Sequence, residues 1–346
     1  MILLWGVPGD GPLRAVRHAL RERKEPFFLL DQHAFADTAL HLSVGGAVQG
    51  TLRSGSAEIA LEAITSVYAR PYDVRQLPGL EGLGPDAPLW RHAVELDDAL
   101  QAWTEVTPAL VINRPSAMAS NGSKPYQAAL IRASGFDVPD TLVTTDPAAA
   151  LAFRERHGSV IYKSVSGVRS IVSRFGDGHL ARLDDIANCP TQFQEYVAGT
   201  DWRVHVVGEE VFAAEILCDR DDYRYSGRAG GVTAIRAGTL GPDFAARCRG
   251  LASALGLRVA GIDLRRSDAG RWVCFEVNPS PGFTFYQEET GQNIGGCIAR
   301  MLAAGGTSVP SSRREAGLTM RPRVPSGAQS LIPITPSPLN SVVNPA

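Results

Sequence analysis

Short apolar runs alternate with helically spaced apolar residues along the first 110 residues. The runs that predict buried strands are 2 to 7, 27 to 31, 66 to 70 and 109 to 113. Helical spacing covers 12 to 24 and about 89 to 104, and the segments 47 to 53 and 56 to 59 predict a hairpin. We therefore predict a small α/β domain over residues 1–110.

The pattern changes after residue 110. A helix is predicted over 116 to 134, and it is followed by a strand, a helix and two strands at 141 to 144, 147 to 157, 160 to 165 and 170 to 175. A hairpin over a helix is a different kind of unit from the N-terminal domain. We predict that residues 111–190 form a central subdomain.

From residue 191 the pattern predicts a mostly antiparallel sheet. Its strands are expected at 192 to 197, 201 to 208, 209 to 216, 259 to 266 and 271 to 278, with helices at 242 to 255 and about 290 to 303. These elements form a predicted C-terminal subdomain over 191–305. Residues 306–346 are rich in Ser, Pro, Arg and Asn and bury too little apolar surface to offset ordering entropy, which predicts a disordered tail.

Composition narrows the class of protein. The chain has 346 residues, 44% hydrophobic and 20% charged, which is a globular balance with room for two or three subdomains. A net charge of -2, with no run of Lys or Arg, argues against nucleic-acid binding. The five cysteines form no C-x-x-C pair, and no stretch reaches the ~20 apolar residues of a membrane span. We expect a cytoplasmic protein.

Three oxygen-bearing side chains converge on two predicted neighbouring strands. Glu276 and Asn278 share one face of a strand, and Asp263 can face them if the strands pair as a hairpin. Two carboxylates and an amide oxygen suit Mg²⁺ that is also bound by nucleotide phosphates. The alternative is that the acids are solvated strand residues, but Glu276 lies among apolar neighbours, where an unpaired carboxylate is costly.

A lysine precedes a turn of small residues in the segment VIYKSVSGVRS. Lys163 lies in a predicted strand, and the turn that follows offers backbone N–H groups. Such a turn and an ammonium group together bind polyanions, so phosphate is the expected partner. The alternative is an ordinary surface lysine.

The segment QFQEYVAGTDWRVHVVG combines a strand end with alternating charged residues. Its apolar strand includes Gln194, Glu195, Tyr196 and Val197 and breaks at Gly199. Asp201 and Arg203 follow at alternate positions and face the same side. Backbone groups at 195 to 197 can pair with an adenine, and Arg203 can stabilise a phosphoryl group in transfer. The alternative is an interdomain hinge with an exposed D-x-R sequence.

Taken in order, these motifs resemble the ATP-grasp superfamily, and most closely its RimK-like branch. They are Lys124 in SNGSKPYQAALIRASGFDVPDT, Lys163, the QEYV segment, the D-W-R sequence and the set Asp263, Glu276 and Asn278. The resemblance covers roughly residues 110 to 304. It implies an α/β (α+β) ATP-grasp fold with a small N-terminal α/β domain, a central hairpin-helix lid and a C-terminal antiparallel sheet.

The resemblance also implies a role for each residue. The catalytic set would be Arg203, Lys163 and Arg224, which lies in the sequence DYRYSG next to the phosphates. ATP would be bound by Lys124, Lys163, Gln194, Glu195, Tyr196, Val197, Asp201 and Arg224. Asp263, Glu276 and Asn278 would bind Mg²⁺, or Mn²⁺ in its place.

Two departures from the RimK-like pattern weaken any transfer of substrate identity. The phosphate turn has only Gly167, where the branch is glycine-rich, and Arg169 can contribute a charge instead. Ser226 stands where an asparagine often follows the arginine of the DYR sequence. The run F-T-F-Y-Q-E-E-T-G from Phe283 and the strand SVYARP at 66 to 71 resemble, more loosely, the graspetide (microviridin-type) peptide maturases.

The implied reaction joins a carboxylate to an amine through an acyl phosphate, releasing ADP and phosphate. Its substrates would be an amino acid and a small molecule, peptide or protein, and the branch often forms homo-oligomers. One alternative is a maturase that forms ester or amide crosslinks between side chains of a precursor peptide. Another is an ATP-binding module without ligase activity, which the two lysines and the acidic set count against.

Overall fold

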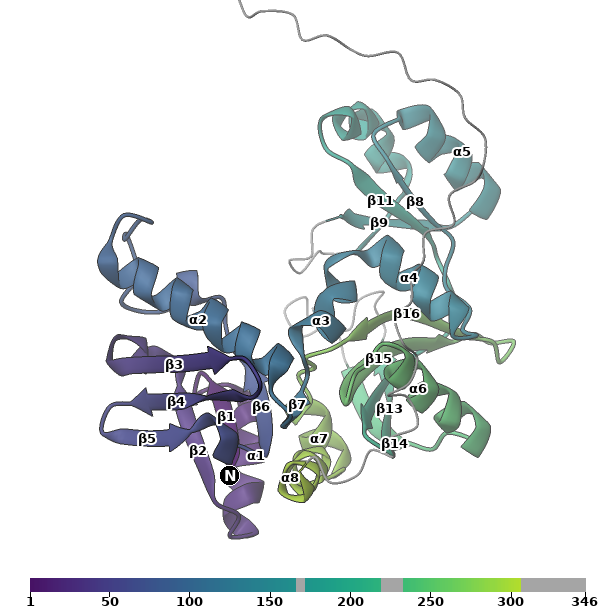
Figure 1. Cartoon of the computed structure of the whole chain (residues 1–346). Coiled ribbons are helices and arrows are strands. Elements are labelled where there is room, and N and C mark those ends of the chain that lie inside the picture. The colour runs from purple at the N-terminus through teal and green to yellow at the C-terminus, as the bar shows by residue number, and fades with distance from the viewer. Residues whose placement is uncertain (166–171, 219–232, 306–346) are drawn as a thin grey trace, which may run out of the picture. The chain divides into compact units, whose positions relative to one another are not determined.

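The computed structural model describes residues 1–165, 172–218 and 233–305 (Figure 1). The N-terminal sheet is parallel, with strand order β2-β1-β6-β7. Its strands are β1 (Ile2–Gly6), β2 (Phe27–Asp31), β6 (Ser66–Arg70) and β7 (Leu110–Ile112). Every residue of β1 is buried, as expected of a central parallel strand covered on both faces. The predicted N-terminal strands are confirmed.

Two helices accompany this sheet, and both were predicted. Helix α1 (Gly11–Glu22) begins at Asp10, whose side chain accepts a hydrogen bond from the backbone N–H of Leu13. Helix α2 (Pro88–Val106) begins at a proline. Proline suits the first turn because it has no backbone N–H that would need a hydrogen-bond partner there.

A separate three-stranded antiparallel sheet follows β2 in the chain. It consists of β3 (Thr38–Val44), β4 (Val48–Ser54) and β5 (Ala57–Ala60), in that order. The predicted hairpin corresponds to β4 and β5. Strand β3 was missed even though Leu40 and Leu42 alternate along it and pack against a hydrophobic cluster of the N-terminal domain; only its first residue is fully buried. Short 3-10 turns are η1 (Gln32–Asp37), η2 (Leu61–Ala63), η3 (Val74–Gln76), η4 (Ala119–Gly122) and η5 (Asp177–Asn188).

The single helix predicted over 116 to 134 is wrong. The segment forms α3 (Pro115–Met118), the turn η4, and then α4 (Lys124–Ala133). Ser123 has extended backbone angles, and its side chain accepts from the backbone N–H of Tyr126, 3.4 Å away, which caps α4. Pro125 in the first turn of α4 cannot donate to a preceding turn, so a continuous helix is excluded.

The central antiparallel sheet has the order β10-β9-β11-β8. Its strands are β8 (Thr141–Thr144), β9 (Val160–Ser164), β10 (Ser173–Arg174) and β11 (Thr191–Glu195). Helix α5 (Pro147–His157) covers one face, where Phe153, Val160 and Phe193 share a hydrophobic cluster. Alternation along β9 and β11 therefore places Lys163, Gln192 and Gln194 on the opposite face.

The C-terminal sheet has five antiparallel strands in the order β14-β13-β12-β15-β16. They are β12 (Thr200–Val207), β13 (Glu210–Cys218), β14 (Thr233–Gly238), β15 (Val259–Arg266) and β16 (Trp272–Asn278). Helix α6 (Pro242–Ala254) matches its prediction, whereas β14 was not predicted because TAIRAG is short and weakly apolar. The tail predicted over 306–346 lies outside the described residues.

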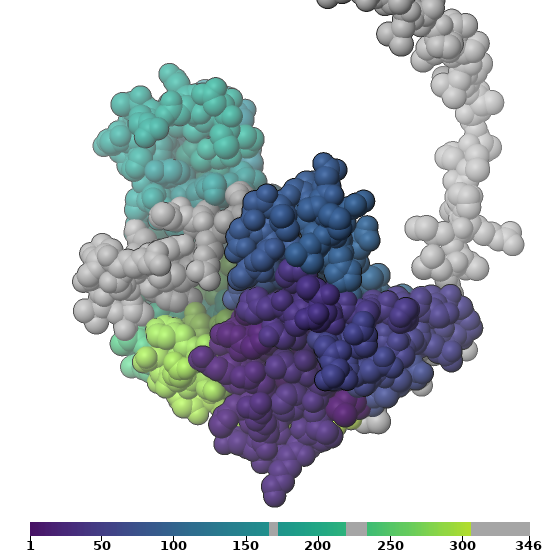
Figure 2. All heavy atoms as spheres, turned by 90° about the vertical axis from the view of Figure 1, so that its left-hand side faces the viewer, coloured from purple at the N-terminus to yellow at the C-terminus, as the bar shows by residue number. Residues whose placement is uncertain are grey.

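The last predicted helix begins later than expected. Helix α7 (Thr284–Thr290) ends at Gly291, whose φ of 70° is left-handed, and α8 (Ile294–Ala304) starts after it. Helix α8 packs on α1, with Ile298 and Leu302 in one hydrophobic cluster with Leu13 and Val16. Figure 2 shows the yellow-green C-terminal part of the described chain lying beside the purple N-terminal part. Among the described residues, no helix is both long and apolar enough to cross a membrane.

Candidate active site

The acidic set predicted on two neighbouring strands is brought together by the C-terminal sheet. Asp263 on β15 lies directly opposite Glu276 on β16, and Gly261 lies opposite Asn278. Residues opposite each other in an antiparallel pair share a face, so the three oxygen-bearing side chains lie on one face, each half-buried. Asn278 Oδ1 accepts a hydrogen bond of 2.9 Å from the backbone N–H of Ser280, which fixes the side-chain oxygen.

A β-bulge interrupts this strand pair beside the acids. The register shifts between Asp263 and Leu264, and Leu264 pairs with Cys274, so Phe275 is the extra residue. A bulge re-aims the side chains next to it. Here Glu276 faces Asp263, while Phe275 lines a neighbouring pocket. No pattern in the sequence indicated this irregularity.

Arg203 on β12 faces the same acids. It lies opposite Asp263, with 2.5 Å between Nη1 and Oδ1, and only 5% of the residue is exposed. Gly261 makes room for it, because a Cβ at Gly261 would lie 2.1 Å from Arg203 Nη2. The guanidinium is therefore in contact with a predicted metal ligand, which places its positive charge beside the predicted metal site.

His205, two residues further along β12, accepts a hydrogen bond from the guanidinium of Arg203. Arg203 Nε donates to His205 Nε2 at 3.4 Å, and the His205 ring lies 5.1 Å from that of Tyr286 on α7. Burial, and then the charge of Arg203, hold the pKa of His205 well below its usual value, although a hydrogen bond with the Gly282 backbone acts in the opposite direction. The imidazole is thus neutral and can accept the Arg203 hydrogen bond.

Asp201 does not face the site as an isolated carboxylate. Arg265 donates to both of its oxygens, with distances of 2.7 Å and 2.9 Å, and Arg265 Nη1 also donates to the carbonyl of Val197 at 2.8 Å. Asp201 and Arg203 do share a face of β12, as predicted. The Asp201–Arg265 pair joins the segment 195 to 197 to the C-terminal sheet.

Some backbone groups of the segment 195 to 197 already have partners. The N–H of Glu195 donates to the carbonyl of Asp140, and the N–H of Tyr196 donates to that of Ser159, each at 2.9 Å. These two donors are not available for an adenine, which narrows the predicted backbone contact to the remaining groups of 195 to 197.

The two predicted nucleotide lysines line one pocket. The pocket has a volume of about 760 Å³, and Lys124, Lys163, Gln192, Gln194 and Phe275 are among its lining residues. Lys124 is the first residue of α4, and Lys163 lies on the open face of the central sheet. A volume of this size suits a ligand as large as a nucleotide.

Two amide oxygens in the wall of this pocket are unsatisfied. Gln192 and Gln194 are 2% and 5% exposed, and among the described residues the Oε1 atom of neither has a hydrogen-bond partner. Buried acceptors of this kind are rare, because each costs about 1–3 kcal/mol. Because the two atoms have almost no contact with solvent, a ligand in the pocket can donate to them only if the side chains turn toward it.

Three side chains that position the site were missed. Gln127 on α4 donates to the carbonyl of Val277 and accepts from its N–H, at 2.8 Å and 3.0 Å, which ties Lys124 to the strand of Glu276. Asn113 donates to the carbonyls of Val259 and Pro279, both at 2.6 Å. Arg70 donates to Ser280 Oγ at 2.9 Å. In the sequence, each of these three residues was marked only as a polar residue next to an apolar run.

Part of the predicted site lies outside the described residues. Arg224 and Ser226 fall within 219–232, and Gly167 and Arg169 fall within 166–171. Their predicted roles stay predictions.

Comparisons with known proteins identify the family of the chain. The family model of the RimK-like ATP-grasp domain matches residues 123–302, which is more than half of the chain, so the chain belongs to the RimK-like ATP-grasp family. The predicted ATP-grasp fold is thereby confirmed.

Curated relatives share only part of their length with this chain. A probable alpha-L-glutamate ligase of Legionella pneumophila (strain Paris) is 33% identical over 159 residues, which is 45% of this chain and 49% of that protein. A ribosomal protein bS6--L-glutamate ligase of Salmonella newport (strain SL254) is 32% identical over 187 residues, 50% of this chain and 60% of that protein. The chain therefore spans about half the length of the curated relatives it matches.

Similar solved structures extend over nearly the whole described chain. The ATP-grasp ligase PsnB, in complex with a phosphomimetic variant of a minimal precursor, Mg and ADP, is 27% identical with a TM-score of 0.71, covering 88% of this chain and 98% of PsnB. The macrocyclase MdnC of Microcystis aeruginosa MRC, bound to the precursor peptide MdnA, has a TM-score of 0.71, 88% coverage of this chain and 99% of MdnC, but 19% identity, and shows the fold alone.

Proposed function

We propose that this protein is an ATP-dependent ligase that activates a carboxylate as an acyl phosphate and joins it to an amine, releasing ADP and phosphate. The observation that carries this proposal is the contact of Arg203 with Asp263 beside Glu276 on one face of the C-terminal sheet. A guanidinium and paired carboxylates in this arrangement serve phosphoryl transfer, in which positioning and charge stabilisation supply most of the catalysis.

The residues present fit the nucleotide. Lys124 and Lys163 would contact its phosphates, and the unsatisfied Oε1 atoms of Gln192 and Gln194 can accept from donors on its base. The backbone groups of residues 195 to 197 other than the N–H groups of Glu195 and Tyr196 would complete the contact with the adenine. Asp201 would hold the nucleotide through its position beside this segment rather than as an unpaired carboxylate.

Asp263, Glu276 and Asn278 would hold Mg²⁺, because two carboxylates and one amide oxygen form a hard-oxygen donor set. When bound, Mg²⁺ neutralises charge on the phosphate oxygens. Arg203 is placed to stabilise charge on the phosphoryl group during transfer to the substrate carboxylate, and Lys163 to orient the leaving phosphates. Arg224 is proposed to add a further positive charge next to the phosphates.

A second candidate substrate class is a precursor peptide, with crosslinks formed between its side chains. The observation that favours it is the likeness to PsnB, whose structure contains a precursor, at 27% identity and a TM-score of 0.71 over 88% of this chain. The acyl-phosphate chemistry is the same in both cases.

Measurement of ADP and phosphate release from Mg-ATP tests the proposal. Purified protein is given amino acids, dipeptides and candidate precursor peptides, and the products are identified by mass. We expect equal ADP and phosphate with one substrate class, lost in Glu276→Ala and retained in Glu58→Ala, which changes an exposed glutamate of β5. AMP and pyrophosphate would contradict the acyl-phosphate mechanism, and tight ATP binding with no turnover would favour the non-catalytic alternative.

A further inference from the structure

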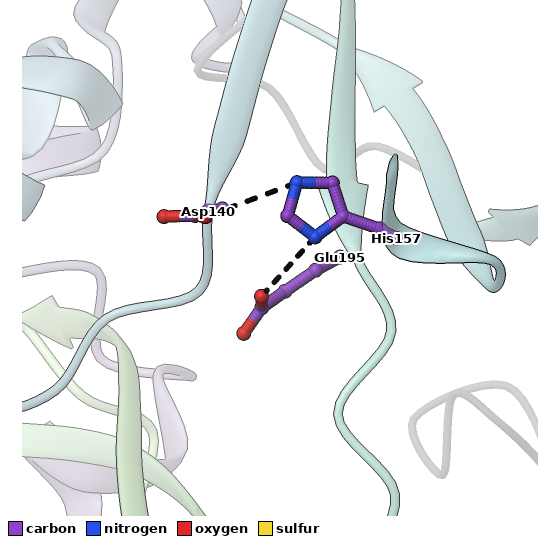
Figure 3. A group of neighbouring side chains, drawn as sticks. All are labelled: Asp140, His157 and Glu195. Carbon is purple, nitrogen blue, oxygen red and sulfur yellow. Dashed lines mark ion pairs between the residues drawn. The ribbon is translucent and has the colours of Figure 1, made fainter. Parts of the chain in front are cut away.

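A histidine lies between the two segments through which the chain enters and leaves the central sheet. Asp140 directly precedes β8, and Glu195 is the last residue of β11. The backbone N–H of Glu195 donates to the carbonyl of Asp140 at 2.9 Å. His157 is the last residue of α5, and Figure 3 shows its imidazole ring between the two carboxylates. One ring therefore lies beside both segments.

The two ring nitrogens of His157 face different carboxylates. Nε2 is 3.8 Å from Asp140 Oδ2, and Nδ1 is 3.6 Å from Glu195 Oε2, so both contacts are ion pairs longer than a hydrogen bond. A neutral imidazole has one N–H and turns a lone pair toward one of the two acids. An imidazolium has an N–H on each nitrogen, and the two point in different directions. Only the protonated ring can therefore serve both carboxylates at once.

The ring is largely enclosed and lies at the negative end of a helix. The His157 side chain is 12% exposed, and among the described residues its Nε2 atom has no hydrogen-bond partner. Unsatisfied carbonyls at a helix C-terminus attract cations, and His157 ends α5. The ring of Phe153 lies 4.4 Å away, and the other basic residues of this helix end are Arg154, which pairs with Asp177, and the exposed Arg156.

Each carboxylate also has an arginine on its other oxygen. Arg132 Nη2 of α4 lies 3.9 Å from Asp140 Oδ1, and Arg271 Nη2 lies 3.9 Å from Glu195 Oε1. The oxygens nearest His157 are Oδ2 and Oε2. Basic and acidic groups thus alternate in a row from Arg132 to Arg271, with the imidazole at its centre. Histidine is the member of this row whose charge changes between pH 5 and 8.

We propose that His157 is a positioning residue that, with both nitrogens protonated, bridges Asp140 and Glu195 and so fixes the segment 195 to 197 for nucleotide binding. The proposal rests on the proposed function, because Asp140 and Gln194 line the 760 Å³ pocket and this segment would contact the adenine. A segment that is already fixed loses less conformational entropy when a ligand binds. Nucleotide should therefore bind more tightly at the lower pH, where the bridge forms.

Titration calorimetry with Mg-ADP at pH 6 and pH 8 tests this role in the full chain, since ADP binding needs no turnover. The ratio of the affinity at pH 6 to that at pH 8 should be about three- to fivefold larger in the parent than in His157→Gln, as for a partly exposed ion pair. Glutamine does not titrate, and titration of the nucleotide cancels in the comparison. His41→Gln, which changes an exposed histidine of β3, is the matched control and should behave as the parent does.

Urea denaturation without nucleotide measures the bridge itself. When the ring gains its second proton, the folded chain gains ion pairs that the unfolded chain lacks. The stability of the parent relative to His157→Gln should therefore rise as the pH falls from 8 to 6. Asp140→Asn is the second variant, because a side chain that is 59% exposed can change without loss of the fold. It removes one carboxylate and should reduce both pH effects.

Three outcomes would overturn the proposal, and they can be told apart. Mg-ADP binding with the same pH dependence in the parent and His157→Gln would show that the ring does not position the nucleotide segment. A stability difference that does not change with pH would show that no bridge forms. Absence of Mg-ADP binding to the parent at either pH would contradict the proposed nucleotide site, and with it the positioning role, whatever the stability comparison shows.

Discussion

The C-terminal sheet and the central sheet each contribute part of the proposed nucleotide site, but their polar groups are satisfied to different degrees. On the C-terminal sheet, Arg203 contacts Asp263 at 2.5 Å and Arg265 binds both oxygens of Asp201. On the central sheet, among the described residues, Gln192 and Gln194 each have a buried oxygen without a partner. We therefore expect the C-terminal half of the proposed site to be preformed and the central half to be completed when a nucleotide binds.

The largest expected effect on activity comes from disturbing the contact of Arg203 with Asp263 on the C-terminal sheet. Gly261→Ala places a Cβ 2.1 Å from Arg203 Nη2 and must displace the guanidinium from Asp263. Because loss of one charge-stabilising donor costs about 10²–10³-fold in rate, we expect kcat for ADP release to fall by about 10²-fold. The circular dichroism spectrum should be retained. A Gly261→Ala enzyme with unchanged kcat would show that the position of Arg203 does not matter.

The next effect concerns the link between α4 and β16. Gln127→Ala leaves the buried N–H and carbonyl of Val277 without their partner, which should cost about 1–3 kcal/mol in the free energy of unfolding. Urea denaturation measures this loss, and ATP affinity should fall with it because Lys124 is on the same helix. Gln49→Ala, at an exposed position of β4, is the control. Equal stability of the two variants would contradict the positioning role of Gln127.

A smaller, pH-dependent effect is expected from His205. Its folded pKa lies well below the unfolded value of about 6.5. Above that value both states are neutral. As pH falls below about 6.5 the unfolded state gains a proton that the folded state does not, so stability falls by up to about 1.4 kcal/mol per pH unit.

Denaturation of wild type and His205→Gln between pH 7.5 and roughly 5 isolates this contribution, because the carboxylates act equally in both. Arg203 and Tyr286 are the charged and titratable neighbours to retain in the variant. The slope of stability against pH should be shallower in His205→Gln. Identical slopes would mean that His205 is not held neutral in the folded protein.

The smallest expected effect concerns the side-chain oxygen of Gln192 on the central sheet, which has no hydrogen-bond partner among the described residues. Gln192→Leu removes an unsatisfied buried oxygen, so the nucleotide-free protein should be no less stable than wild type, and up to about 1 kcal/mol more stable. Stabilisation by Mg-ATP should shrink, since the acceptor is lost. Thermal unfolding with and without Mg-ATP measures both. A variant that loses stability without nucleotide, yet gains as much from Mg-ATP as wild type, would contradict the proposed role of Gln192.

Much of this architecture could be predicted from short-range patterns. The strands Phe27–Asp31, Ser66–Arg70 and Val259–Arg266 begin and end where the apolar runs predicted. The pairing of Asp263 with Glu276 followed from strand alternation and a hairpin connection. These features depend on residues that are close together in the sequence, and the pattern of apolar and polar residues records such short-range relations.

The rest depends on contacts between residues far apart in the sequence. Gln127 and Val277 are 150 residues apart, and Asn113 and Val259 are 146 apart, so neither amide could be distinguished from a surface residue. The bulge at Phe275 follows from how β15 and β16 pair, which leaves no signature in composition. The break before Lys124 was available from Ser123 and Pro125, but helical periodicity over 116 to 134 outweighed those signals.

The most direct test of the central claim is transfer of ¹⁸O from the substrate carboxylate to the released phosphate. The substrate identified by ADP release is labelled at its carboxylate and converted with Mg-ATP by wild type and by Glu276→Ala. Formation of an acyl phosphate predicts one ¹⁸O atom in each phosphate released by the wild type, and no phosphate from the variant. Unlabelled phosphate, or label recovered in AMP, would contradict the account.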